Sequence, residues 1–363
     1  MRRSRVLGHH RVMTTERGGR PGSTGVDPAE QACRSQIAAG DVSAHERLGR
    51  LLADRGDFAG AVEQFRAGAA AGDETAAASL VRFEGTGAMT ATFGDLLFAW
   101  TGDDFEGHFA AVETYIEVVG VVGAVEAAGA WCESGDVHRV AAGFDVYGCL
   151  VDTEVGVVPL LAGAAAAVVG HPDEDVRWSA ARALGRTNAP ATLAPLLAFA
   201  SDEDSDVRWW VTLALPSLVG EEDGPDHPAV AALLVLARDE DDAIRDWATF
   251  GLGQQLEVDS PAVREALFAN LDDSDEDSDA AGEAALGLAL RGDPRVFDVL
   301  VRKLLASHVG NLYVEAAGRL ADSRLLPLLE DLRRDGWQDE LMGVLTLDDA
   351  IARCEGRPDV SAQ

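Results

Sequence analysis

Apolar residues recur every three to four positions along most of this chain, which is the spacing of helices that bury one face. The pattern starts at Ala29, becomes hard to follow within residues 73–110, and resumes near Phe105. From about Val121 to Arg353 it predicts a continuous series of helix pairs. The sequence therefore predicts an all-α protein.

A short phrase repeats within this series. The residues Asp-Val-Arg-Trp at 175–178 return at 206–209, and they return as Ala-Ile-Arg-Asp at 243–246. Degenerate copies of the phrase follow, and each copy is followed by a residue at which we expect the helix to end. These residues lie 31 to 37 positions apart and are Gly148, Gly185, Pro216, Gly253, Gly287 and Gly318. Such a period is typical of stacked helix pairs that bury their apolar faces on their neighbours. We expect a right-handed α-solenoid of about six pairs.

Changes in this pattern predict the domain organisation. Residues 1–28 are rich in Arg, Gly, Ser and Thr and have little to bury, so we expect a disordered basic leader. Met13 offers a second start position. We assign residues 29–88 to a helical hairpin region, residues 89–352 to the solenoid, and residues 353–363 to a disordered tail.

The hairpin region resembles a tetratricopeptide hairpin in the spacing of Leu48, Gly49, Ala61 and Phe65. In that family, small residues let two antiparallel helices approach closely while a Phe fills the seam. His45 stands where a Trp is usual, and no Pro ends the second helix. A generic helix pair is the other interpretation.

The repeats themselves resemble the HEAT-repeat family, in its short bacterial form related to phycobilin-lyase-type repeats. The resemblance covers about residues 121–350, is strongest over 173–252, and at 245–253 is similar to actinobacterial proteins. It implies a curved scaffold that binds other macromolecules, with the second helix of each pair on the concave surface. Lys303 is the only lysine among 30 basic residues, which indicates a GC-rich bacterial genome. A salt-adapted organism is the other interpretation.

An acidic turn precedes each Val-Arg helix. These turns span residues 172–175, 201–206, 239–242 and 272–279. Their carboxylates can cap the free amides at a helix N-terminus and interact with its dipole. The last turn could also hold Ca²⁺, but it lacks the Gly and the terminal Glu of a dedicated loop, so a capping turn is favoured.

The repeat arginines Arg177, Arg208 and Arg245 occupy matching positions beside turn aspartates. Arginine can hold a carboxylate with two parallel hydrogen bonds. We therefore expect a ladder of Arg–Asp contacts from repeat to repeat.

Helical geometry directs two positions of each Val-Arg helix away from the core. At 100° per residue, the position after the repeat Arg points almost opposite to the buried face, and the position four residues later lies about 130° from it. The first position holds Trp178, Trp209 and Asp246, and the second holds Arg182, Leu213 and Phe250. Trp210 and Trp247 lie nearer the core, and we assign them to packing.

Exposed aromatic residues on a concave face usually mark a binding site. We therefore predict a partner-binding groove that contains Trp178, Trp209, Leu213, Phe250, Arg182 and Asp246. The other interpretation is that superhelical curvature buries these side chains against neighbouring repeats.

The net charge of the chain disfavours some classes of partner. The chain has 62 acidic and 30 basic residues and a net charge of −32. Such a body repels phosphate backbones and anionic membranes, so we expect no nucleic acid and no membrane as partner. The longest uncharged stretch, Val155–Gly170, is shorter than the roughly 20 residues of a membrane span. Four scattered cysteines without a CxxC motif are typical of a reduced, cytoplasmic protein.

Catalytic signatures are missing from the sequence. We find no Walker A motif, no Gly-x-Ser-x-Gly elbow, and no His-x-x-x-His or adjacent His-Glu pair. We therefore expect no catalytic residue, no cofactor and no metal site.

The leading hypothesis is a non-catalytic scaffold that binds a protein or peptide with a basic surface. An immunity protein that neutralises a basic toxin would belong to this class. The alternative is a bilin-lyase-type enzyme, for which Asp246 and Cys149 are the candidate residues. A self-assembly module is a third hypothesis, and the oligomeric state is not predicted.

Overall fold

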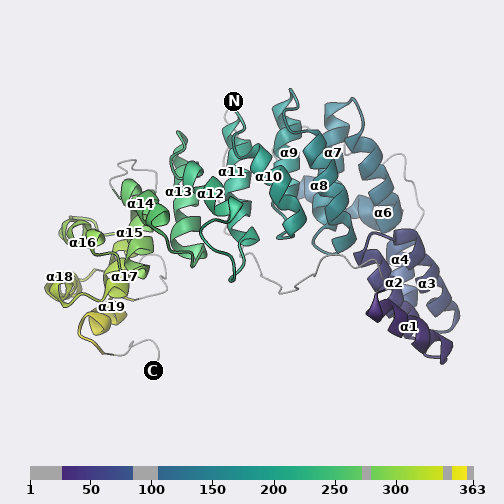
Figure 1. The fold of residues 1–363 in the computed structure, drawn as a ribbon, viewed down its shortest axis with the longest axis horizontal. Coiled ribbons are helices and arrows are strands. Elements are labelled where there is room, and N and C mark those ends of the chain that lie inside the picture. The colour runs from purple at the N-terminus through teal and green to yellow at the C-terminus, as the bar shows by residue number, and fades with distance from the viewer. Residues whose placement is uncertain (1–26, 85–104, 272–278, 338–345, 358–363) are drawn as a thin grey trace.

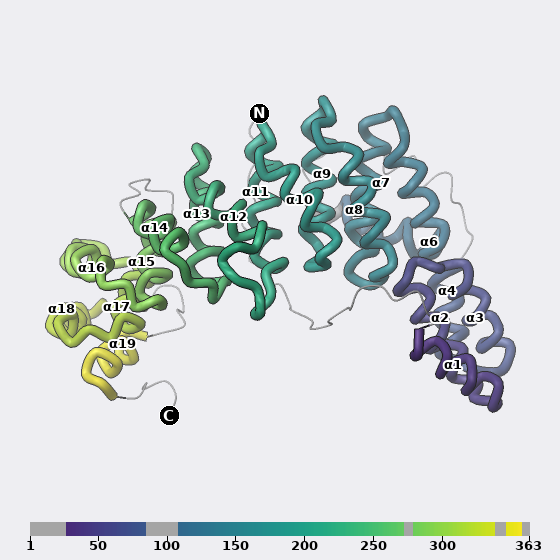
Figure 2. Tube along the Cα trace, in the orientation of Figure 1, coloured from purple at the N-terminus to yellow at the C-terminus, as the bar shows by residue number. Residues whose placement is uncertain are grey.

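The computed structural model describes residues 27–84, 105–271, 279–337 and 346–357, and all regular secondary structure within these ranges is helical. The helices form an elongated arch (Figure 1). The chain passes steadily from one end of the arch to the other, so each helix contacts helices that are near it in sequence (Figure 2). This arrangement confirms the predicted α-solenoid.

The N-terminal end of the arch is a group of short helices: α1 (Pro28–Ala38), α2 (Ala44–Asp54), α3 (Phe58–Ala70) and α4 (Glu74–Glu84). Helices α2 and α3 form the predicted hairpin. A Cβ added to Gly49 would lie 2.4 Å from the Phe65 ring, so only glycine permits this close approach. Phe65 is fully buried, as expected for a residue that fills the seam.

The next segment contains α6 (Phe105–Cys132) and α7 (Val137–Leu150). Its residues 108–132 are long and apolar enough to cross a membrane by length and composition alone. However, Gly120 has a φ of 74° and divides α6 into two helices that meet at a kink. Neither half reaches the roughly 20 residues that a membrane span requires.

With the α6–α7 pair, which contains the predicted helix end Gly148, the described residues form seven helix pairs, against about six predicted. Six of these pairs follow α7. Their elements are η1 (Val155–Val157), α8 (Val158–Ala167), α9 (Glu174–Leu184), η2 (Pro190–Thr192), α10 (Leu193–Phe199), α11 (Ser205–Ala214), η3 (Leu215–Leu218), α12 (Pro228–Leu236), α13 (Asp242–Phe250), the π-helical turn η4 (Gly251–Gln255), α14 (Pro261–Asn270), α15 (Ala280–Leu290), η5 (Pro294–Val296), α16 (Phe297–Leu304), α17 (Asn311–Leu320), η6 (Ser323–Leu325), α18 (Leu326–Arg334) and α19 (Leu347–Cys354). Cys354 is buried, so the solenoid extends two residues past the predicted boundary.

The second helices of the pairs form the inner row of the arch. From α7 to α19 they contact one another in an unbroken series, and more closely than the first helices do. Helices on the inner side of a curved solenoid must lie closer together than those on the outer side. At the C-terminal end, α17 and α19 lie toward the inside of the curve, with α16 and α18 at its outer edge (Figure 1).

Aspartates cap the Val-Arg helices as predicted. The side chain of Asp173 accepts a hydrogen bond from the Asp175 amide at the start of α9. Asp204 and Asp241 each accept bonds from two amides at the starts of α11 and α13. These bonds satisfy amides that have no partner within the helix. Most of the predicted turn at 272–279 lies outside the described residues.

The predicted Arg–Asp ladder joins successive repeats at two of its three arginines, Arg177 and Arg208. Arg245 donates to the Asp239 and Glu240 carbonyls, and the turn at 272–278 that follows it lies outside the described residues. Arg177 donates from Nε and Nη2 to the two carboxylate oxygens of Asp202, at 2.8 and 3.0 Å. Arg208 holds Asp239 in the same way, at 2.8 and 2.7 Å. Each arginine also donates to a carbonyl of its own turn, at His171 and Asp202 respectively. Because both arginines are buried, water does not replace these bonds.

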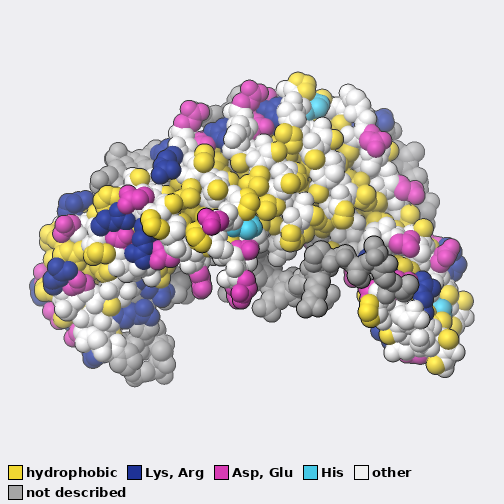
Figure 3. Space-filling model, in the orientation of Figure 1, with side chains coloured by type: hydrophobic (Ala, Val, Ile, Leu, Met, Phe, Trp, Pro, Cys, Tyr) yellow, Lys and Arg dark blue, Asp and Glu magenta, His cyan; other side chains and the backbone are white. Residues whose placement is uncertain are grey.

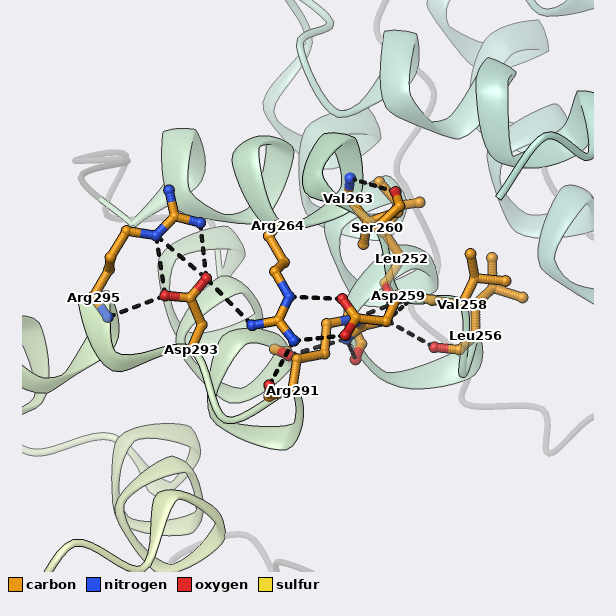
Figure 4. Close-up of polar contacts among 12 residues, drawn as sticks. Leu252, Leu256, Val258, Asp259, Ser260, Val263, Arg264, Arg291, Asp293 and Arg295 are labelled. Atoms are coloured by element: carbon orange, nitrogen blue, oxygen red, sulfur yellow. Dashed lines mark hydrogen bonds and ion pairs between the residues drawn. The ribbon is translucent and has the colours of Figure 1, made fainter. Parts of the chain in front are cut away.

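A second polar contact between repeats forms where the inner helices end (Figure 4). The Arg291 guanidinium donates to the carbonyl oxygens of Leu252, Gly253, Leu256 and Val258 at 2.7 to 2.9 Å. Its side chain is only 6% exposed. These carbonyls belong to the π-helical turn and the residues after it, so a cation from the next repeat satisfies a helix C-terminus.

The N-terminal helices are fixed to the solenoid by a close backbone contact. A Cβ on Gly156 would lie 2.0 Å from the Ala53 carbonyl oxygen and 2.4 Å from the Gly56 nitrogen. Beside this contact, the buried Glu154 carboxylate pairs with Arg82 at 2.9 Å. The hairpin region therefore continues the arch in a defined orientation.

We predict that Arg208→Ala lowers the free energy of unfolding by about 3 kcal/mol, because it leaves a buried carboxylate without its cation. Urea unfolding at pH 7 measures this change. Burial alone would raise the pKa of Asp239, but hydrogen bonds from Arg208 outweigh burial and hold it below 3.8. The pair therefore stabilises the fold above that pH, and the difference between variant and wild type should shrink as the pH falls below about 4.

The control for this substitution is Arg334→Ala, which removes an arginine that is 70% exposed and pairs with Asp331. It should change the free energy of unfolding by less than about 0.5 kcal/mol. Equal effects of the two substitutions would show that the ladder contributes no special stability.

We predict that Gly156→Ala destabilises the protein by about 1–3 kcal/mol, since the added methyl group meets backbone atoms that cannot rotate away. Gly163→Ala is the matched control. It lies within α8 with open space around its Cβ position, and it should stabilise the helix by about 0.5–1 kcal/mol. Thermal unfolding of both variants tests the prediction, and a neutral Gly156→Ala would contradict the proposed docking contact.

Candidate partner-binding surface

The six predicted groove residues occupy equivalent faces of three successive inner helices. Trp178 and Arg182 lie one turn apart on α9, Trp209 and Leu213 on α11, and Asp246 and Phe250 on α13. Residues four positions apart are neighbours on a helix surface. The structure therefore places the predicted residues in one series along the inner row.

Aromatic rings connect α9 to α11, and further ring contacts form within α11 and within α13. The Trp178 and Trp210 rings meet edge to face with centroids 6.2 Å apart, and Trp209 meets Trp210 at 5.0 Å. On α13, Trp247 and Phe250 meet at 5.7 Å. We call Trp178, Trp209, Trp210, Trp247 and Phe250 the aromatic strip. Edge-to-face contacts of this kind stabilise ring positions beyond the effect of burial alone.

The aromatic strip is half-buried rather than open. All five side chains have intermediate exposure, and the three α9 and α11 indoles also pack against the hydrophobic core. The large apolar side chains that are widely exposed lie elsewhere, such as Val235 on α12 and Phe268 on α14. The expectation of fully exposed aromatic residues was thus too simple, because adjacent inner helices are close enough for their indoles to cover one another.

Trp210 and Trp247, which we expected to serve only core packing, are also partly exposed. Both have the same intermediate exposure as Trp209, and Trp210 contacts both of the other indoles. A single-helix projection separates neighbouring positions by 100°, whereas an indole is wide enough to span that difference.

Arg182 is a correction to the predicted groove. It is only 5% exposed, and it forms an ion pair with Asp145 of α7. The guanidinium also lies over the rings of Phe109 and Trp178, at 4.7 and 4.8 Å. Asp145 additionally contacts His108 Nε2 at 2.5 Å. Arg182 therefore joins α6, α7 and α9, and it is not available as an open contact.

The inner row becomes acidic beyond the aromatic strip. Asp246, Glu283 and Glu315 lie on α13, α15 and α17, and we call these three residues the acidic patch. Burial first, and then the negative charges of Asp246, Asp279 and Glu315, together raise the pKa of Glu283 to about 8. Several carboxyl groups therefore share one partly dehydrated region.

Sequence reasoning missed Glu283 and Glu315. They lie in the degenerate copies, where the Val-Arg pair that identifies the other inner helices is missing. Their position on the two inner helices that follow Asp246 is the signal that could have identified them. It requires the register of the degenerate repeats, which the sequence phrase alone does not fix.

The two candidate residues for lyase chemistry do not come together. Cys149 lies on α7 and Asp246 on α13, which are separated by α9 and α11. Burial raises the pKa of Cys149 to about 11. At pH 7 this leaves about one thiolate in ten thousand molecules. Across the described ranges, no three His, Cys, Asp or Glu side chains are grouped so as to hold a metal ion.

Charge is unevenly distributed over the molecular surface. Arginine and lysine side chains gather toward the C-terminal end of the arch, on the left of Figure 3. Many of them are paired with nearby carboxylates, as Arg295 is with Asp293 and Arg324 with Asp322. These pairs lie at the starts of the outer helices. Within the acidic patch, Arg319 pairs with Glu315 at 3.0 Å.

Comparison with known proteins agrees with this architecture. A family model for HEAT repeats matches residues 161–253, which include α9, α11 and α13. No curated protein matches the chain. The X-ray structure of the Escherichia coli protein YibA is similar, with a TM-score of 0.57, 22% sequence identity, and coverage of 73% of this chain and 91% of that one. The central residues 161–253 are therefore similar to HEAT repeats, and the likeness to the solved structure agrees with a helical solenoid.

Proposed function

We propose that this protein is a non-catalytic scaffold that binds a protein or peptide along its inner row of helices. The observation that supports this proposal best is the aromatic strip, which extends over three consecutive repeats. Tryptophan and tyrosine are enriched among residues that dominate binding energies, and half-buried rings are already held in position. HEAT repeats are generally scaffolds for protein interactions, which agrees with this function.

Charge favours a basic partner. The net charge of −32 gives the whole molecule a negative field that attracts cations and repels nucleic acids and anionic membranes. The acidic patch begins next to Phe250, the last ring of the aromatic strip. A partner that places apolar side chains on the rings and basic side chains beyond them would match both parts of the surface.

The raised pKa of Cys149 and its distance in the fold from Asp246 favour the scaffold over the bilin-lyase alternative. Four free cysteines agree with a reducing cytoplasm, where we place the protein. The close packing of Gly49 on Phe65 supports kinship of the N-terminal hairpin with tetratricopeptide repeats. We retain a bacterial, actinobacterial-type origin as part of this proposal.

We predict that Trp209→Ala weakens binding of a selected peptide at least about tenfold, because a large aromatic anchor is removed from the centre of the surface. Peptides are selected from a displayed library on the wild-type protein, and dissociation constants are then measured by fluorescence polarisation. Helical content should stay unchanged by circular dichroism.

The matched control is Phe268→Ala, which removes an aromatic side chain from the outer helix α14 and should leave the affinity unchanged. Equal affinities of the Trp209 and Phe268 variants would contradict the proposed surface. Loss of helical content together with binding would show that Trp209 serves only the core.

A further inference from the structure

The inner row changes character at α13. On its N-terminal side the half-buried side chains are indoles, and on its C-terminal side Glu283 and Glu315 follow on α15 and α17. Asp246 and Phe250 lie one turn apart on α13 itself, so a carboxylate adjoins the last ring of the aromatic strip. An aromatic face and a group of carboxyls thus meet at this helix.

The same combination occurs at α9, where the chain fills it with its own arginine. The Arg182 guanidinium lies 4.8 Å from the centroid of the Trp178 ring and pairs with the Asp145 carboxylate. A planar guanidinium can stack on a ring and bind a carboxylate at the same time, whereas a lysine ammonium cannot do so equally well. The protein therefore contains an internal example of the cation that fits such a surface.

Among the described residues, the charges that act on Glu283 include no cation. The charges that influence its carboxyl come from Asp246 on α13, Asp279 at the start of α15 and Glu315 on α17, and all three are negative. The nearest arginine on α17, Arg319, is bonded to Glu315 at 3.0 Å. Within the described ranges, the Glu283 Oε2 atom is buried and makes no hydrogen bond. An added cation would therefore relieve both the repulsion and the missing bond.

We propose that the junction of the aromatic strip and the acidic patch binds an arginine side chain of an extended partner segment. The arginine stacks on the Phe250 side of the strip and donates to Glu283, while an apolar neighbour of that arginine rests on the indoles. This inference rests on the proposed function and specifies the chemistry of its partner.

Binding of the arginine should change the protonation state of Glu283. In the free protein, Glu283 holds a proton at neutral pH because its pKa is about 8. A bound guanidinium favours the carboxylate, so binding releases that proton. Affinity should therefore rise by up to tenfold per pH unit between about pH 6 and 8 and level off above pH 8.

The test is isothermal titration calorimetry of the full-length protein with the peptide acetyl-Gly-Leu-Arg-Leu-Arg-Gly-amide. A second peptide carries citrulline, the neutral isostere, in place of both arginines. Titrations at pH 7 in two buffers of different ionisation enthalpy count the protons released. We expect the arginine peptide to bind at least tenfold more tightly than the citrulline peptide and to release more than half a proton.

Glu283→Gln is the diagnostic variant. It keeps the shape of the protonated side chain and removes a source of repulsion, so the fold should be at least as stable as that of the wild type. We expect this variant to bind the arginine peptide at least tenfold more weakly at pH 8 and to release no proton on binding. Glu265→Gln, which changes an exposed carboxylate on the outer helix α14, should alter neither quantity.

Equal binding of the two peptides, or unchanged affinity and proton release in Glu283→Gln, overturns the inference. These outcomes are distinguishable from failure of the proposed function. If selected peptides still depend on Trp209 while Glu283→Gln has no effect, the scaffold function stands and the arginine site is wrong. If Trp209→Ala also has no effect on any peptide, the inner surface is not a binding surface.

Discussion

The orientation of the central repeats depends on a bidentate contact between an arginine of one repeat and an aspartate of the next, formed by Arg177 with Asp202 and by Arg208 with Asp239. A single helix pair cannot bury its apolar face alone, so stability comes from the interfaces between pairs. Apolar packing between alanine-rich helices is weakly directional. The guanidinium group of Arg177 or Arg208 fixes the orientation of one repeat relative to the next. It binds a carboxylate across the interface and a carbonyl in its own turn.

This constraint also shapes the surface. Once the inner helices are held at a fixed spacing, large side chains on one helix reach those on the next. The Trp178 ring on α9 meets the Trp210 ring on α11, and Trp210 also meets its neighbour Trp209. One turn after Trp178, the position equivalent to Leu213 and Phe250 holds Arg182, whose side chain pairs with Asp145 and is buried. The same spacing brings Asp246 and Glu283 into electrostatic contact and raises the pKa of Glu283.

The sequence predicts the fold well because its determining features are local. The repeated phrase identifies the Val-Arg helices, the aspartates before them indicate their caps, and Gly49 with Phe65 indicates the hairpin seam. Side-chain exposure was predicted less well. A projection around one helix predicts burial only from the angle between a side chain and the core. It does not account for cover by neighbouring side chains, such as the cover that Trp210 gives to Trp209. Glu283 was missed because its repeat has lost the phrase that sets the register.

The most direct test of this account is a double-mutant cycle between Arg208 and Asp239. Unfolding free energies are measured in urea for wild type, Arg208→Ala, Asp239→Ala and the double variant. If the contact between repeats stabilises the solenoid, the sum of the losses of unfolding free energy in the two single variants should exceed the loss in the double variant by at least about 1 kcal/mol. Additivity within about 0.3 kcal/mol would show that the two side chains contribute independently and would contradict the account.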